Sequence, residues 1–193
     1  MARIRDEWIA GLASSDALAR ADSASAIYAT GRGRADQALQ HWRQEEEFAR
    51  LVGRDPKVTV GLAVRPETFA EIREANGSPR LADVPAEQDA SEFELHFAGD
   101  VSLDVLTSRQ PEGSGAIAKF LRKFGQGVQQ VEFRCTDVDQ ATQILRERFG
   151  IKPVYPETRP GADGTRVNFF LVTVSGGEKI LIELYESAVT RSE

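Results

Sequence analysis

Carboxylate side chains interrupt the apolar strands of this 193-residue chain at places where they could transfer protons. Glu183 lies inside the apolar run ILIEL, and Glu132 follows two glutamines in GVQQVEF. A buried carboxylate is unfavourable unless it is paired with a cation or bound to a metal ion. We therefore predict that Glu183 and Glu132 are catalytic residues, although an ion pair with Arg134 would also satisfy Glu183.

His96, in the run EFELHF, is a third candidate for catalysis. Imidazole titrates near neutral pH, so His96 could act as a general base or replace a missing metal ligand. The alternative is that His96 lies at a solvated rim of its sheet. Asn168 and Arg166 are expected to bind polar groups of a substrate, while Arg166 could instead shield an edge strand.

The alternation of side chains along a strand predicts which residues share one face. If the apolar faces of the strands pack on helices, the other faces should surround one cavity. The residues predicted to face this cavity are Thr59, Gly61, Glu94, His96, Ser102, Asp104, Gln130, Glu132, Arg134, Asn168, Phe170, Glu183 and Tyr185. Of these, Arg134, Tyr185 and Thr59 are further candidates for substrate binding. Gln129 has the opposite parity and no assigned role.

Two similar segments supply these strands. Residues 1–54 have helical periodicity, and the glycines of ATGRGRAD are expected to separate two helices. Residues 57–108 alternate strands with one helix, residues 109–126 form a linker helix, and residues 127–187 repeat the first pattern. The predicted fold is α+β, with two βαβββ modules forming a curled mixed sheet around a cavity, preceded by an N-terminal helical segment.

Composition limits the partners of this protein. Its formal net charge of -6 argues against nucleic-acid binding, which depends on clustered Lys and Arg. No segment approaches the roughly 20 apolar residues that span a bilayer, and the N-terminus lacks the apolar core of a signal peptide. The single Cys135 cannot form an intramolecular disulfide and is expected to be a small buried apolar residue. We expect a cytoplasmic protein that binds a small molecule.

From Gly113 onward the chain resembles methylmalonyl-CoA epimerase and related proteins of the vicinal oxygen chelate superfamily. The resemblance lies in GSGAIAKFLRKFGQGVQQVEFRCTDVD, ETRPGADGTRVNFFLV and KILIELYE. The epimerase counterparts are a SPIAKFL linker helix, a GxHHVAF strand, an RPGxGGxRVxF turn and strand, and a closing LIEL. Residues 57–108 match the family only in their pattern of strands and helix.

The resemblance implies a divalent metal ion held in the cavity by the first and last strands of each module. Carried over by position, the ligands fall on Thr59, Asp104, Gln130 and Glu183. The epimerases carry histidine at two of these positions, which here are Thr59 and Gln130. Hydroxyl and amide oxygens are weaker ligands than imidazole for first-row metals and suit harder ions. Metal ligation is accordingly expected chiefly from Asp104, Gln130 and Glu183.

Two functions follow from the resemblance. The first is a glyoxalase-like or epimerase-like isomerase or lyase that acts on a small carbonyl or acyl compound by metal-assisted enolisation. The second is a metal-free member of the same fold that binds a small molecule or a partner without catalysis. Without a strong metal site an enolate would lose its main stabilisation. Metal binding therefore distinguishes the two functions. The modules can pair within one chain or across a homodimer.

Overall fold

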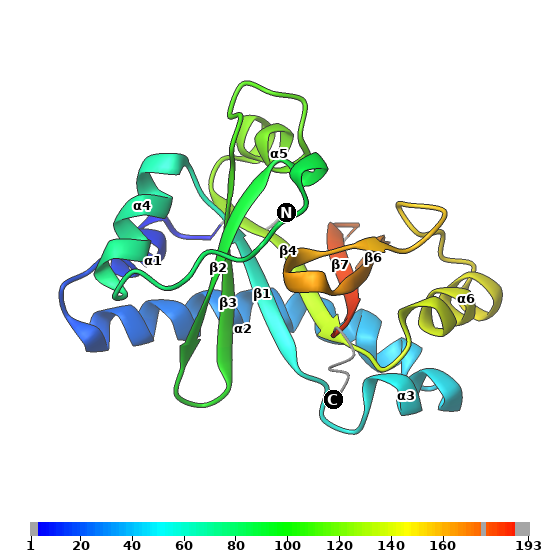
Figure 1. Ribbon diagram of the computed structural model, residues 1–193. Coiled ribbons are helices and arrows are strands. Elements are labelled where there is room, and N and C mark those ends of the chain that lie inside the picture. Colours follow the sequence, from blue (N-terminus) through cyan, green and yellow to red (C-terminus); the bar gives the residue numbers. More distant parts are fainter. Residues whose placement is uncertain (1–3, 175–176, 188–193) are drawn as a thin grey trace, which may run out of the picture.

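The computed structural model describes residues 4–174 and 177–187 of the chain. At its centre is a seven-stranded mixed sheet in the order β2-β3-β1-β4-β7-β6-β5, curled into a half-barrel (Figure 1). The predicted α+β class and curled mixed sheet are confirmed. The strands are β1 (Val58–Ala63), β2 (Ala90–Phe97), β3 (Val101–Ser108), β4 (Gly127–Arg134), β5 (Arg159–Pro160), β6 (Arg166–Thr173) and β7 (Lys179–Glu186).

The two halves of the sheet repeat one arrangement about the seam between β1 and β4, which pair antiparallel. In the first half β1 pairs with β3 in parallel, and β3 pairs antiparallel with β2. In the second half β4 pairs with β7 in parallel, and β7 pairs antiparallel with β6. Both halves therefore come together within one chain.

The first half has fewer strands than the βαβββ pattern predicts. The segment between α4 (Pro66–Ala75) and β2 runs beside β2, where the amide of Ala82 donates a hydrogen bond to the carbonyl of Glu92 at 3.0 Å. Pro79 and Pro85 flank this contact and have no amide N–H to donate, which prevents a continuous ladder. In the second half the corresponding strand is the two-residue β5.

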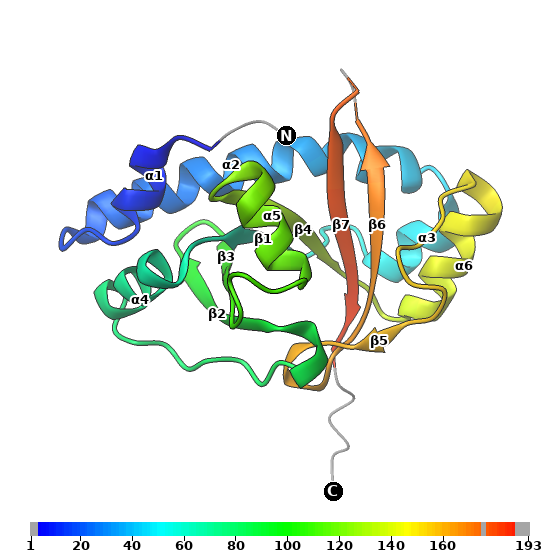
Figure 2. The same ribbon diagram turned by 90° about the horizontal axis from the view of Figure 1, so that it is seen from above.

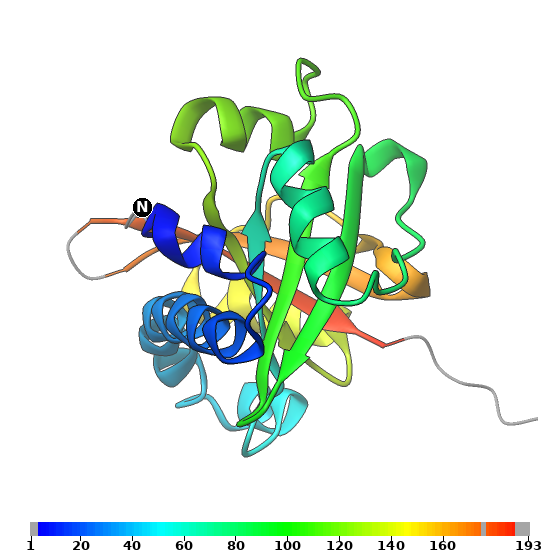
Figure 3. The same ribbon diagram turned by 90° about the vertical axis from the view of Figure 1, so that its left-hand side faces the viewer.

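Helices cover the face of the sheet that carries the apolar residues. They are α1 (Asp6–Gly11), α2 (Ala17–Trp42), α3 (Glu46–Val52), α4 and α6 (Val138–Phe149), while α5 (Ala116–Phe124) joins the two halves. The long helix α2 crosses the strands and contacts β1, β3, β4 and β7 (Figure 2). Viewed nearly along α2, α1 lies directly beside it (Figure 3). None of the described helices is long and apolar enough to cross a membrane.

The predicted helix break at ATGRGRAD is wrong, because α2 continues through it. Gly31 lies where α2 passes over β1, and a Cβ atom built there would be 2.5 Å from Cγ1 of Val60. Gly33 has open space around its Cα. The first glycine therefore permits close contact of helix and sheet, and this close packing outweighs the low helix propensity of both glycines.

Candidate active site

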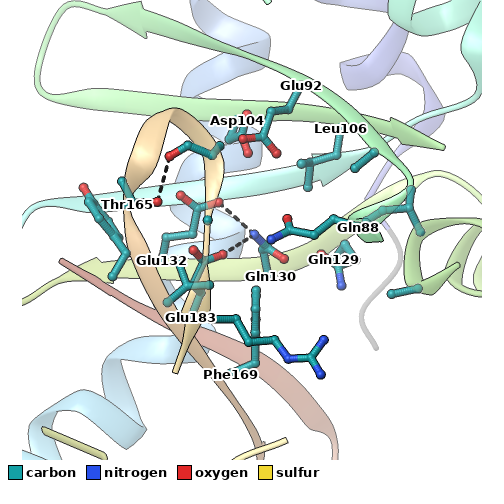
Figure 4. Close-up of a pocket in the computed structure, with 18 of the residues that line it drawn as sticks. Gln88, Glu92, Asp104, Leu106, Gln129, Gln130, Glu132, Thr165, Phe169 and Glu183 are labelled. Atoms are coloured by element: carbon teal, nitrogen blue, oxygen red, sulfur yellow. Dashed lines mark hydrogen bonds between the residues drawn. The ribbon is translucent and has the colours of Figure 1, made fainter. Parts of the chain in front are cut away.

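The opposite, concave face of the sheet encloses a cavity of about 330 Å³. Its polar walls come from four strands: Glu92 and Glu94 of β2, Asp104 of β3, Gln129, Gln130 and Glu132 of β4, and Glu183 and Tyr185 of β7. Apolar residues complete it, among them Leu106, Ile117, Val167, Phe169 and Leu181. Figure 4 shows Asp104 and Glu92 on one side and Glu132 and Glu183 around Gln130 on the other.

Gln130 joins the two glutamates that the sequence marked as catalytic candidates. Its side-chain Nε2 donates a hydrogen bond to Oε2 of Glu183 at 2.7 Å and another to Oε1 of Glu132 at 3.1 Å. Glu132 and Glu183 lie opposite each other on the parallel strands β4 and β7. Gly61 faces Gln130 across the seam, and a Cβ there would be 2.5 Å from Cγ of Gln130. The glycine therefore leaves the space that the Gln130 side chain occupies.

Gln129 also lines the cavity, and a β-bulge explains how. Gly61 pairs with Gln130 and Leu62 pairs with Val128, which leaves Gln129 as the extra residue of β4. Its side chain is 7% exposed, and its Oε1 atom has no hydrogen-bond partner. The alternation of side chains along a strand did not predict a cavity position for Gln129. A bulge adds one residue to the strand and interrupts this regular alternation.

Asp104 lies across the cavity from the Gln130 amide and is only 6% exposed. Its Oδ1 atom has no hydrogen-bond partner. Thr59 is 1% exposed, pairs in register with Glu132 and also has an unpartnered hydroxyl. Thr59 is not among the residues that line the cavity. The site therefore contains buried acceptor oxygens that its own side chains do not satisfy.

Burial raises the pKa of the three inner carboxyl groups. Desolvation raises the pKa of Glu132 to about 7, although the hydrogen bond from Gln130 opposes this shift. The pKa values of Asp104 and Glu183 are raised well above their ordinary range, first by desolvation and then by neighbouring carboxylates. Carboxyl groups whose charges are poorly solvated and repel one another retain their protons to higher pH.

Glu92 extends this acidic group along β2 and was not singled out by the sequence. Burial raises the pKa of Glu92 to about 7, with contributions from Asp163 and Glu94, while Arg109 opposes the shift. The polarity of the SEFELHF strand alternates, so Glu92 shares the parity of the predicted cavity residue Glu94. That parity was the signal that could have identified it.

His96 lies outside the cavity. Its Nε2 is 2.9 Å from Oε2 of Glu94, and its Nδ1 is 3.1 Å from Oγ of Ser102. The side chain is 57% exposed, so the solvated-rim position describes His96 in this structure. From there it contacts Glu94 but has no hydrogen bond to the Gln130 amide group among the described contacts.

The two arginines proposed for substrate binding also lie outside the cavity. Arg134 is exposed at the end of β4, and no hydrogen bond or ion pair joins it to Glu183 among the described contacts. Arg166 forms ion pairs with Asp139 and with Glu186, the latter at 3.4 Å. Arg166 therefore ties β6 to the start of α6 and to the end of β7.

The predicted parity of β6 is wrong. Asn168 and Phe170 are fully buried on the helix side, where Phe170 meets the ring of Trp42 edge-on at 6.4 Å. Asn168 donates a hydrogen bond to the carbonyl of Tyr155 at 3.4 Å and does not line the cavity. Its neighbour Phe169 faces the cavity instead. The run VNFFLV contains apolar residues at both parities, so alternation could not distinguish its faces.

Aromatic and basic groups close the cavity at its other end. Tyr185 lines the cavity as expected, and burial raises the pKa of its hydroxyl. Arg159 lies over the ring of Tyr155, with its guanidinium carbon 4.0 Å from the ring centre. Both residues line the cavity, and sequence reasoning assigned neither of them a role.

The positions that the resemblance assigns to a metal ion do not fit one in this arrangement. Gln130 presents its NH₂ group to Glu183 and Glu132, whereas a metal ion would require its oxygen. The four positions supply no imidazole or thiolate, the ligands that bind zinc and similar metals most strongly. In the described part of the chain, no group of three His, Cys, Asp or Glu residues is placed to hold a metal ion.

Several solved structures with the same architecture are methylmalonyl-CoA epimerases. The enzyme from Mycobacterium tuberculosis is 32% identical over 67% of this chain and 86% of its own, with a TM-score of 0.55. A Streptomyces coelicolor epimerase in complex with 2-nitronate-propionyl-CoA is 26% identical over 68% and 96%, with a TM-score of 0.54. An epimerase in complex with methylmalonyl-CoA and NH4+ is 26% identical over 70% and 96%, with a TM-score of 0.53.

No family model and no curated protein matches the chain. The family therefore rests on the solved structures, on the paired halves around one cavity and on the strand motifs that carry Gln130 and Glu183. The chain belongs to the vicinal oxygen chelate superfamily, among the proteins similar to methylmalonyl-CoA epimerase.

Proposed function

We propose that this protein binds a small carbonyl or acyl compound in the cavity and moves a proton at the carbon next to the carbonyl group. Glu132 and Glu183 are the acid–base pair. The observation that carries the proposal is the Gln130 amide, which holds both carboxyl groups on one wall of an enclosed site. Two carboxyl groups held side by side can each exchange a proton with a substrate that lies against this wall.

The Gln130 hydrogen bonds also determine which oxygens are left for the substrate. Gln130 occupies Oε1 of Glu132 and Oε2 of Glu183. Oε2 of Glu132 and Oε1 of Glu183 remain for proton transfer. In the proposed step, one carboxylate removes a proton from the carbon and the other carboxyl group returns a proton, so the substrate changes configuration or isomeric form without net change in its atoms. This is isomerase chemistry, and loss of a leaving group after the first transfer would make it a lyase.

The proposal does not use a metal ion. Methylmalonyl-CoA epimerases with acyl-CoA ligands support a substrate with an activated carbon next to a carbonyl group. The wall of this cavity, however, has an amide N–H donor at one expected ligand position and an unpartnered carboxylate oxygen of Asp104 at another. An enolate oxygen would need hydrogen-bond donors of the protein instead.

A second candidate function is binding of a small molecule without catalysis. Among the described lining residues, Arg159 is the only Lys or Arg, and it is stacked on Tyr155. An enolate among several carboxyl groups gains little stabilisation from a single cation that is stacked on an aromatic ring. This shortage of positive charge favours the binding function over fast catalysis.

Hydrogen–deuterium exchange at carbon distinguishes these two functions. The probes are the propionyl, β-alanyl and succinyl thioesters of N-acetylcysteamine, which are neutral, cationic and anionic, and proton NMR in D₂O follows the signal beside the carbonyl. We expect faster exchange with the protein than in buffer, and a loss on the order of 100-fold in Glu183→Gln and in Glu132→Gln.

Glu147→Gln on the exposed face of α6 is the matched control, because Glu147 bonds only to Gln143 in the described contacts and should leave exchange unchanged. Circular dichroism verifies that each variant is folded. If no thioester exchanges faster than in buffer, the catalytic proposal is rejected. A rise in melting temperature with the same probes would then support the binding function.

A further inference from the structure

The cavity has a large excess of acidic groups over basic ones. Glu92, Asp104, Glu132 and Glu183 line its interior, and Glu87, Glu94 and Asp163 line its rim. Arg159 is the only Lys or Arg among the described lining residues. Ionisation of the inner carboxyl groups is opposed by burial and by their neighbours, so an ammonium group would stabilise their ionised form, whereas an anionic ligand would add to the repulsion.

Two of the rim carboxylates, Asp163 and Glu94, have basic partners. In the described contacts no ion pair joins an interior carboxyl group to a cation, and Arg109 and Lys57 act on Glu92 and Glu132 only through longer-range electrostatics. Arg80 forms two hydrogen bonds with Asp163, at 2.6 and 3.0 Å, and His96 lies 2.9 Å from Glu94. The charged groups that act on Asp104 are the four glutamates at 92, 94, 132 and 183, which are all acidic. Glu132 and Glu183 share only the neutral amide of Gln130.

Two buried acceptor oxygens in the cavity lack a donor, and one of them does not belong to the acidic group. Oε1 of Gln129 and Oδ1 of Asp104 have no hydrogen-bond partner, and both side chains line the cavity while being more than nine-tenths buried. A buried acceptor without a donor is unfavourable by about 1 to 3 kcal/mol. Both oxygens therefore require the same chemistry from a ligand, namely N–H or O–H donors.

We propose that the ligand of this cavity is a small organic cation whose ammonium group donates hydrogen bonds to Asp104 and Gln129. An ammonium group supplies three donors and a positive charge, so it matches both deficits at once. The inference rests on the proposed function only in taking this cavity as the ligand site. It adds the class of compound, a carbonyl or acyl compound that carries an amine.

The rest of the cavity fits the body of such a compound. Phe169, Leu181 and Val167 provide an apolar wall, and Leu106 and Ile117 lie on the other side. A cavity of about 330 Å³ is far larger than a single ion and has the size of a site for a small organic molecule. Apolar contact would bind the carbon skeleton while the acidic end binds the ammonium group.

Three compounds with one skeleton test this inference: phenethylamine, 2-phenylethanol and phenylacetate. Isothermal titration calorimetry at pH 7.5 compares the wild type with Asp104→Asn, Gln129→Leu and the surface control Glu147→Gln. We expect phenethylamine to bind at least about tenfold more tightly than the alcohol, and phenylacetate not to bind. Asp104→Asn should weaken phenethylamine binding at least about tenfold, Gln129→Leu should weaken it less, and Glu147→Gln should not change it.

Equal binding of the alcohol and the amine, or preferred binding of phenylacetate, would overturn the inference. So would stabilisation of the protein by Mg²⁺, Ca²⁺ or Zn²⁺ with no effect of phenethylamine on the melting temperature. Binding of phenethylamine without any catalysed exchange of the thioesters would reject the proposed catalysis alone. Exchange of the propionyl thioester without binding of phenethylamine would reject this inference alone.

Discussion

Nε2 of Gln130 lies 2.7 Å from Oε2 of Glu183, at the position where the family resemblance places a metal-binding histidine. The amide nitrogen is a donor, so it binds the carboxyl group itself. A histidine ligand would bind a metal ion that in turn binds the carboxylate. Gln130 in place of histidine keeps a link between β4 and β7. It removes the metal ion on which the chemistry of the family depends.

Replacement of Gln130 should destabilise the protein, because two buried carboxyl groups would lose their donor. We expect Gln130→Met, which retains the side-chain volume, to lower the free energy of unfolding by about 2 to 4 kcal/mol. Urea denaturation measures the change. Gln143→Met is the control, since Gln143 bonds to Glu147 on an exposed helix surface and should shift stability by less than about 0.5 kcal/mol. Equal effects of the two substitutions would show that the Gln130 hydrogen bonds contribute no more to stability than the exposed Gln143 hydrogen bond.

Because its carboxyl groups are buried, we expect the free energy of unfolding of the protein to fall as pH rises. Burial raises the pKa of Glu132 to about 7 from an ordinary value of 4.5, so the folded protein binds more protons than the unfolded chain between these values. The contribution of Glu132 is complete below about pH 4.5 and is lost as pH rises through 7. Glu132→Gln should therefore flatten the decline between pH 5 and pH 8 by about 1 to 3 kcal/mol.

Chemical denaturation at several pH values measures this slope. Glu147→Gln serves again as the comparison, because Glu147 is exposed on α6 and bonds only to Gln143 among the described contacts. If the wild-type protein became more stable between pH 5 and pH 8, and Glu132→Gln removed this rise, the raised pKa of Glu132 would be contradicted.

Two glycines in one helix should respond oppositely to alanine. Gly31→Ala would bring a Cβ atom to 2.5 Å from Val60, so we expect a loss of about 1 to 3 kcal/mol of stability from overpacking. Gly33→Ala meets open space in the same helix and should gain about 0.5 to 1 kcal/mol from higher helix propensity. Thermal unfolding of both variants provides the comparison. Similar changes in both would mean that α2 does not press on β1 at Gly31.

The contact between the two loops at the cavity rim should control their local opening. Asp163 accepts two hydrogen bonds from Arg80 and one from the amide of Asp83, and its own amide donates to the carbonyl of Asp83. We expect Arg80→Ala to accelerate amide hydrogen exchange at Asp83 and Asp163 without affecting the central strands. Arg5→Ala, which removes an exposed pair with Glu7 and a cation–π contact with Trp8, should leave these amides unchanged. Unchanged exchange in Arg80→Ala would mean that the backbone bonds alone hold the loops.

The sequence predicted the sheet and its inner carboxylates for a simple reason. Strand alternation is a local property, so the cavity positions of Asp104, Glu132 and Glu183 follow from their neighbours in the chain. The repeat also gave the correct relation between the two halves, since their strands occupy equivalent places on each side of the β1–β4 seam.

Other features depend on contacts that a local pattern does not contain. Gln129 enters the cavity through a bulge, and a bulge appears only when β4 is paired with β1. Phe169 and Asn168 lie on the faces opposite to those predicted. The reason is that the Trp42 ring of α2 packs against Phe170 of β6, which places Phe170 on the helix side. The continuity of α2 through Gly31 depends on its packing on Val60. Each of these errors has a tertiary contact as its cause.

Metal content shows whether the Gln130 amide has replaced a metal ion in this cavity. Inductively coupled plasma mass spectrometry is applied to the wild type and to the double variant Thr59→His/Gln130→His, both purified without chelators and then incubated with Zn²⁺ or Co²⁺ and desalted. We expect less than about 0.1 metal ion per chain in the wild type and about one in the double variant, because imidazole restores the strong ligands. About one tightly bound metal ion per chain in the wild type, lost on Gln130→Ala, would contradict this expectation.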